Sequence, residues 1–182
     1  MKRINYDNSL LDKINKILKC KKIESLIDVE FAKKVNVSII YPTDDYLLDE
    51  LQFQAIVNLL DKNDNLYIMQ LGIDSNLHSL NHELYQLNYP YSYQEYQLLE
   101  FYSISVVFSN KLDWILLIDE SLNGGIGILA GDSTNINLFE TTYGKTKNDI
   151  CKLGEFFIED ATRNKNALLY MKKIFNLVAS QS

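Results

Sequence analysis

The sequence predicts an α+β fold, in which a mostly antiparallel sheet of five or six strands carries helices packed on one face. Four strand-like runs follow one another between residues 101 and 142 with short connections, which is typical of an antiparallel meander. Helical patterns begin and end the chain, over residues 9–21 and again after residue 146. No repeat or long linker interrupts the 182 residues, so we expect a single globular domain over residues 1–182.

The first third of the chain predicts two helices with a strand between them. Ser9 caps a helix over residues 9–21, in which apolar side chains recur at every third or fourth position. Residues 34–41 are rich in β-branched side chains and stop at a proline, which predicts a strand. Thr43 then caps a helix over residues 44–62, whose early acids suit the positive end of the helix dipole.

The middle of the chain predicts a strand and a long connection. Residues 65–72 have the composition of a strand. Residues 79–100 form a tyrosine-rich connection with a short helix that begins at the capping box from Ser92 to Glu95.

The last part of the chain changes from strands to helices. The four strands are expected over residues 101–109, 112–120, 125–132 and 135–142. Thr146 and Asp149 then form a capping pattern for a helix over residues 147–161, and residues 165–179 continue as a second helix or as the same helix bent.

Residues 121–132 contain four of the seven glycines and pose the question of a phosphate-binding loop. A dinucleotide loop needs G-x-G-x-x-G between a strand and a helix N-terminus. Gly125, Gly127 and Gly131 have a different spacing, and a further strand is expected after them. We therefore interpret Asn123–Gly124 as a hairpin turn, and the last two glycines as a bulge or a close backbone approach.

Two other segments resemble ligand-binding motifs without completing them. Gly144–Thr146 has the end of a P-loop, but the required first glycine is replaced by Phe139. Asp61–Asn65 has the start of a calcium loop, but Leu66 and Gly72 replace its glycine and its bidentate acid. The second segment is better interpreted as a solvated turn between a helix and a strand.

The only two histidines, His78 and His82, are four residues apart and would share one face of a helix. They could meet a metal ion or lie on a polar surface turn, and the surface turn is the preferred interpretation because no cysteine is near. A triad based on histidine would have to use this same pair. We therefore assign no catalytic residue, no metal ligand and no cofactor.

Carboxylate chemistry stays open as an alternative at one place in the sequence. Asp113, Asp119 and Glu120 flank the strand that carries the single tryptophan, Trp114. A pair of such acids could act in general acid–base catalysis. Acids at strand ends are more often solvated, so an enzyme is the less favoured interpretation.

The net charge of −6 is distributed unevenly along the chain. Residues 1–34 carry nine basic and five acidic side chains, residues 35–144 carry two and fifteen, and residues 145–182 carry seven and four. Nucleic acid is therefore an unlikely class of partner, since its binding needs cations that neutralise phosphates. A basic protein is the class of partner that an acidic middle segment favours.

Cysteine content and hydropathy indicate a cytoplasmic protein without a membrane partner. Cys20 and Cys151 lie far apart, in segments expected to be helical, and match no metal or redox spacing, so we expect reduced thiols. No apolar run reaches the length of a signal peptide or a membrane span. The sequence leaves open whether the protein is a monomer or a homodimer.

Tyrosines are concentrated in the acidic middle segment without neighbouring cations. The set comprises Tyr85, Tyr89, Tyr91, Tyr93, Tyr96 and Tyr102. They either fill the core or form a contact patch for a protein, because aromatic residues that bind nucleic acid are accompanied by Lys and Arg.

The run FYSISVVFSNKLDWILLIDESLNGGIGILAGD, residues 101–132, resembles the immunity proteins that neutralise bacterial polymorphic toxins. The resemblance covers about residues 90–142 and consists of a strand, a tryptophan-containing strand, a glycine turn and another strand. It implies a stoichiometric inhibitor that covers the active site or substrate groove of a toxin, such as a cationic nuclease. The segment GIGILAGDSTNINLF is also similar in style to acidic secretion chaperones, which would imply a homodimer that holds an unfolded segment.

The candidate partner-binding residues are chosen by charge and expected exposure within residues 44–120. They are Asp44, Asp45, Asp49, Glu50, Tyr89, Tyr91, Glu95, Glu100, Asp113, Asp119 and Glu120. Together they predict an acidic contact surface that carries tyrosines.

Overall fold

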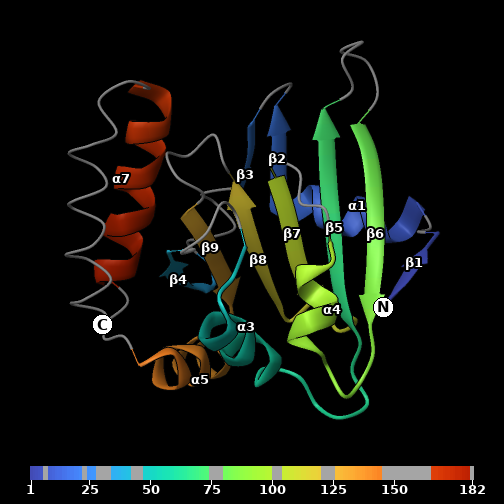
Figure 1. Ribbon diagram of the computed structural model, residues 1–182. Helices are drawn as coiled ribbons and strands as arrows, with labels where there is room; N and C mark the ends of the chain where they lie inside the picture. Colours follow the sequence, from blue (N-terminus) through green and yellow to red (C-terminus); the bar gives the residue numbers. More distant parts are fainter. Residues whose placement is uncertain are drawn as a thin grey trace.

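The computed structural model describes residues 1–5, 8–21, 24–27, 34–41, 47–73, 80–99, 104–119, 126–144 and 165–180. Within them, seven strands form one antiparallel sheet (Figure 1). In spatial order these are β1 (Lys2–Ile4), β6 (Leu80–Leu87), β5 (Leu66–Ile73), β7 (Ile104–Ser109), β8 (Trp114–Asp119), β9 (Ile126–Gly131) and β4 (Asn36–Ile40). A separate hairpin pairs β2 (Leu18–Lys21) with β3 (Glu24–Ile27). The described helices are α1 (Asn8–Ile17), α3 (Glu50–Val57), α4 (Tyr93–Gln97), α5 (Ser133–Tyr143) and α7 (Lys165–Ser180).

The antiparallel sheet is confirmed, but it has seven strands rather than five or six. The predicted strands at β4, β5, β7, β8 and β9 are present. The additional strands are β1, which is only three residues long, and β6, which replaces the first part of the expected connection over residues 79–100. The interpretation of that part as a connection is wrong because it pairs with β5 along its whole length, from Leu80 to Leu87.

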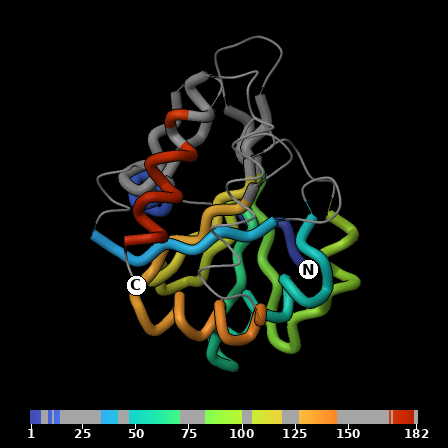
Figure 2. Tube along the Cα trace, turned by 90° about the vertical axis from the view of Figure 1, so that its left-hand side faces the viewer, coloured from blue at the N-terminus to red at the C-terminus, as the bar shows by residue number. Residues whose placement is uncertain are grey.

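Helices cover both faces of the sheet, so the expectation of one covered face is wrong. On one face, α1 and α7 pack on a core that includes Ile14 and Ile174. On the other face, α3, α4 and α5 pack through side chains such as Phe53 and Phe139. Figure 2 shows the sheet between α7 on one side and α3 and α4 on the other. The central strands allow this arrangement because they are apolar on both sides; Ile115–Ile118 are at most 1% exposed.

The run over residues 135–142 is a helix, α5, and its interpretation as a strand is wrong. Asp132 caps this helix, because its side chain accepts a hydrogen bond of 2.8 Å from the backbone N–H of Asn135. Ile136, Phe139 and Tyr143 are buried at helical spacing. The spacing of apolar residues by three or four, which is typical of a helix, therefore describes this segment better than the strand-like alternation does.

A helix N-terminus does follow the glycine-rich segment, so the earlier reason for excluding a dinucleotide loop fails. Gly127 and Gly131 still do not form a dinucleotide loop, because they lie inside β9 and the side chain of Asp132 caps the helix N-terminus. The predicted close approach at the two glycines is confirmed: a Cβ atom at Gly131 would lie 2.9 Å from the Cβ of Trp114. Of the two alternatives given for these glycines, the bulge is absent, since β9 pairs without interruption with β8 and β4.

Two predicted helices have different limits in the structure. The helix expected from residue 44 begins at Glu50, and its cap is Asp49 instead of Thr43. The helix expected over residues 9–21 ends at Ile17 and is followed by β2, so Cys20 lies in a strand. The C-terminal helix is confirmed as α7, and Ser92 caps α4 as expected.

Several predictions concern residues outside the described part of the chain. These are the turn at Asn123–Gly124, the helix over residues 147–161 with its cap at Thr146 and Asp149, Cys151 and His78. His82 is described and lies in β6, so the helical spacing assumed for the two histidines is wrong.

Candidate protein-binding surface

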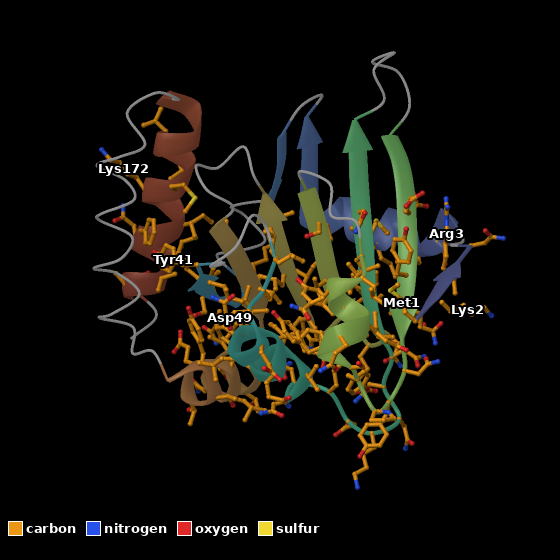
Figure 3. All side chains as sticks on the ribbon, in the orientation of Figure 1. Met1, Lys2, Arg3, Tyr41, Asp49 and Lys172 are labelled. Carbon is orange, nitrogen blue, oxygen red and sulfur yellow. The ribbon has the colours of Figure 1, made fainter. Side chains whose placement is uncertain are left out.

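Among the described helices, Lys occurs only in α1 and α7, which cover the same face of the sheet. α3, α4 and α5, which cover one face, contain no Lys or Arg. α7, on the other face, contains three lysines and no acid. In Figure 3, Lys172 projects from α7, whereas Asp49 lies at α3. The helices from the acidic middle of the sequence thus form one layer, and a basic terminal segment contributes to the opposite layer.

The side of α3 and α5 that faces away from the sheet combines leucine with uncharged polar residues. Leu51 on α3 is 56% exposed, and Leu138 on α5 is 42% exposed. The two helices pack against each other. We call this region the α3–α5 surface; its exposed residues are Leu51, Gln54, Asn58, Thr134, Asn137, Leu138 and Thr141.

Three polar side chains on or beside the α3–α5 surface donate hydrogen bonds within their own helix. The side-chain amide of Gln54 donates to Asn58 at 3.2 Å. The hydroxyl groups of Thr141 and Thr142 donate to the carbonyls of Asn137 and Leu138 at 2.8 and 2.9 Å. Removing water from these groups costs less free energy, because they keep these internal hydrogen bonds in a complex.

Acids lie at both ends of the α3–α5 surface. Asp132 is exposed at the N-cap of α5. At the other end of α5, the side-chain amide of Gln52 in the first turn of α3 donates to the hydroxyl of Tyr143 at 3.4 Å. This contact brings the exposed Glu50, which begins α3, to the C-terminal end of α5.

α4 extends the same layer and is fixed to α3 by aromatic side chains. The ring of Phe53 lies 4.8 Å from that of Tyr96 and 5.6 Å from that of Tyr93. The Tyr96 hydroxyl accepts a hydrogen bond from the backbone N–H of Leu48 at 3.2 Å. The helix ends at Leu98, which is 76% exposed. α4 thus adds a third exposed leucine to the layer.

A second candidate region is a cluster of charged and tyrosine side chains at the end of the sheet where β5 begins and β7 ends. The Nζ atom of Lys111 lies 2.8 Å from Asp61 and 2.9 Å from Asp64. The Tyr91 hydroxyl donates to the backbone carbonyl of Asp64 at 2.6 Å. We call Asp61, Asp64, Tyr91 and Lys111 the loop-end cluster. It ties the turn before β5 to the turn after β7, so its main effect is structural.

The two acids of the loop-end cluster differ in exposure. The side chain of Asp64 is 5% exposed and that of Asp61 is 80% exposed. Burial by itself raises the pKa of Asp64, but hydrogen bonds from Lys111 and from the backbone of Asp61 outweigh it, and the pKa lies below its ordinary value. The same contacts raise the pKa of Lys111. Asp64 therefore stabilises the fold in its charged form.

We expect Asp64→Asn to lower the free energy of unfolding at pH 7 by about 1–3 kcal/mol, because a buried charged partner of Lys111 is lost. The folded-state pKa of Asp64 is below the unfolded value of about 3.9, so its contribution is present above that value and disappears as the pH falls through the folded pKa. The difference between the two proteins should therefore shrink at acid pH. Urea unfolding between pH 7 and pH 2 measures it.

The matched control is Asp61→Asn, which changes an exposed member of the same cluster and should have a much smaller effect at every pH. An equal loss of stability in both variants would contradict the assignment of the buried charge to Asp64.

The candidate partner-binding residues fall into three groups. Asp49, Glu50 and Glu95 belong to the helical layer; Asp49 caps α3, and the Glu95 carboxylate lies 2.7 Å from the amino group of Met1. Tyr89, Tyr91 and Asp113 lie in loops, with Tyr89 55% exposed and Asp113 accepting a hydrogen bond from Ser109 at 2.7 Å. Outside the described residues or side chains are Asp44, Asp45, Glu100, Asp119 and Glu120.

The structure divides the tyrosines between the core and the surface. Tyr96 is fully buried, Tyr85, Tyr91 and Tyr93 pack at the edge of the same core, and Tyr89 is exposed. Tyr102 lies outside the described residues. A continuous tyrosine surface is therefore not present among the described tyrosines.

Sequence reasoning missed the exposed leucines Leu51, Leu98 and Leu138, since the candidate residues were chosen among acids and tyrosines. A signal was available in α3, where the buried residues Phe53 and Ile56 define a stripe that leaves Leu51 on the opposite side. For α5, the same reasoning required recognising the helix first.

Of the three acids in the alternative of carboxylate catalysis near Trp114, only Asp113 has a side chain that the structure describes. Trp114 is 1% exposed and packs in the core, while Asp113 is exposed and bonded to Ser109. The described part of the chain also contains no group of three His, Cys, Asp or Glu side chains that could hold a metal ion.

The geometry defines an α/β/α layered protein with an acidic helical face. Comparisons with protein-family models, curated proteins and solved structures found no match to this chain. None of the described helices is long and apolar enough to cross a membrane.

Proposed function

We propose that this protein is a binding protein whose helical layer of α3, α4 and α5 docks a basic protein, and that it acts as a stoichiometric inhibitor of a bacterial toxin domain such as a cationic nuclease. The observation that carries the proposal is the composition of that layer. It lacks Lys and Arg, yet exposes Leu51, Leu98 and Leu138.

This composition matches the general anatomy of protein interfaces. Apolar side chains at the centre supply buried area, and charges at the rim steer the partner and set its orientation. Glu50 begins α3 next to Leu51, Asp132 caps α5, and Glu95 lies on α4 three residues before Leu98. The resemblance of residues 90–142 to immunity proteins supports the toxin as the class of partner.

The test is affinity capture from the native host, first with the wild type and then with a Leu51→Ser/Leu98→Ser/Leu138→Ser variant. We expect one basic protein bound at about one to one. The triple variant should bind it at least about 100-fold more weakly, because burial of each leucine contributes roughly 1.5 kcal/mol or more. Titration calorimetry with the purified partner measures the affinities.

Leu169→Ser is the matched control, because Leu169 is 59% exposed on α7, on the other face of the sheet. This variant should bind like the wild type. Glu50→Lys combined with Glu95→Lys should slow association and weaken its salt dependence. Binding that survives all three leucine changes, or a captured partner that is acidic, would rule out the proposed function.

A further inference from the structure

We infer that the α3–α5 surface receives an amphipathic α-helix of the partner, with Lys or Arg residues just beyond both ends of its apolar stripe. This inference rests on the proposed function and specifies which segment of the basic partner makes the central contact.

The first argument is the low cost of removing water from the α3–α5 surface. The amide of Gln54 and the hydroxyls of Thr141 and Thr142 have partners within their own helices. The threonine hydroxyls are thus already bonded to the backbone of α5 and need no partner from outside. Together with Leu51 and Leu138, this makes the centre of the surface more apolar than its sequence suggests.

The second argument concerns the conformation of the partner. Added strands bind to sheet edges, where rows of backbone N–H and C=O groups are free to pair. Inside α3 and α5 these groups bond within each helix, so the α3–α5 surface offers no such row. A helix brings its own backbone hydrogen bonds and can pack its side chains into the groove between two helices.

The third argument is the placement of charge. The 11 residues of α5 span about 16 Å. Asp132 lies at one end, and Glu50 of the neighbouring α3 lies at the other. A partner helix of about three turns covers this span, and cations beyond its two ends meet these acids. Acids at both ends of the partner helix would be repelled.

The experiment places the photo-reactive residue p-benzoylphenylalanine at position 51 or 138 of the full-length protein in its native host. After irradiation, mass spectrometry identifies the crosslinked residues of the partner. We expect adducts from both positions in one basic segment, at residues spaced by three, four or seven. A synthetic peptide of that segment should gain helical circular dichroism when the protein is added. The control carries the same residue at position 169, on α7, and should give no adduct with this segment.

Three outcomes would overturn the inference. One is adducts at alternating residues of a segment that stays non-helical in the titration. Another is adducts with a second copy of this chain, which would make the surface a homodimer interface. The third is the absence of adducts at both positions while the leucine variants still weaken capture, which would place the partner elsewhere on the layer and leave the proposed function standing. Failure of the proposed function is separate, since capture itself would then yield no basic partner.

Discussion

Gln70→Met is expected to raise the free energy of unfolding by about 1–2 kcal/mol. Gln70 is fully buried, and neither end of its carboxamide has a hydrogen-bond partner in the described part of the chain. Ser105, which pairs with Gln70 from β7, is also buried, and its hydroxyl has no hydrogen-bond partner in the described part of the chain either. A buried polar group without a partner costs more than an apolar side chain of similar shape, so methionine should stabilise this position.

The matched control is Gln52→Met, which changes an equally buried glutamine that has partners. Its amide donates to the carbonyl of Tyr41 at 2.5 Å, and its oxygen accepts from the backbone N–H of Asp49 at 3.0 Å. The control should therefore lose about 2–3 kcal/mol. Urea unfolding followed by the fluorescence of the single, buried Trp114 measures both variants.

Opposite signs for the two glutamines are the critical result, because most substitutions in a core destabilise. If Gln70→Met destabilises the protein as much as Gln52→Met does, the prediction is wrong. The carboxamide of Gln70 must then have a hydrogen-bond partner in solution.

Gly131→Ala is expected to lower the free energy of unfolding by about 2–3 kcal/mol. Gly131 pairs with Trp114 on β8 and with Asn36 on β4. A Cβ atom at this position would lie 2.9 Å from the Cβ of Trp114 and 3.2 Å from the backbone oxygen of Asp113. Backbone atoms within a paired strand cannot move aside easily, so the sheet must distort.

Gly144→Ala is the control for a glycine that is needed for a different reason. Gly144 ends α5 with a φ of 70°, and a Cβ atom there would meet no atom within 4 Å. Alanine should cost only about 1 kcal/mol, from its preference against the left-handed conformation. Thermal unfolding of the two variants distinguishes the causes. A loss at Gly131 no greater than that at Gly144 would contradict the close contact with β8.

The sequence predicted most of the sheet because its strands carry strong local patterns. β7, β8 and β9 are short apolar runs with turn residues between them, and they pair in the expected meander. Prediction failed at α5, where alternation of apolar residues competed with helical spacing and the cap at Asp132 was overlooked. It failed again at β6, whose polar and aromatic composition resembles a loop until β5 lies beside it.

Three acids of the helical layer were among the candidate residues chosen from the sequence, but its exposed leucines were not. Asp49, Glu50 and Glu95 lie at α3 and α4, and their place in one layer with Leu51, Leu98 and Leu138 depends on three helices packing on one core. The loop-end cluster was not predicted either, because Lys111 is far in sequence from Asp61 and Asp64.

The sequence by itself determined the α+β class, the antiparallel pairing of the central strands and the acidic charge of the middle segment. These properties follow from composition and from patterns a few residues long. The tertiary structure decided that both faces of the sheet are covered and that the helices of the acidic middle lie opposite α1 and α7. It also decided which leucines stay exposed. The reason is that burial depends on which helices and strands pack together. Which side of a helix or strand stays exposed is set by the side that its neighbours cover.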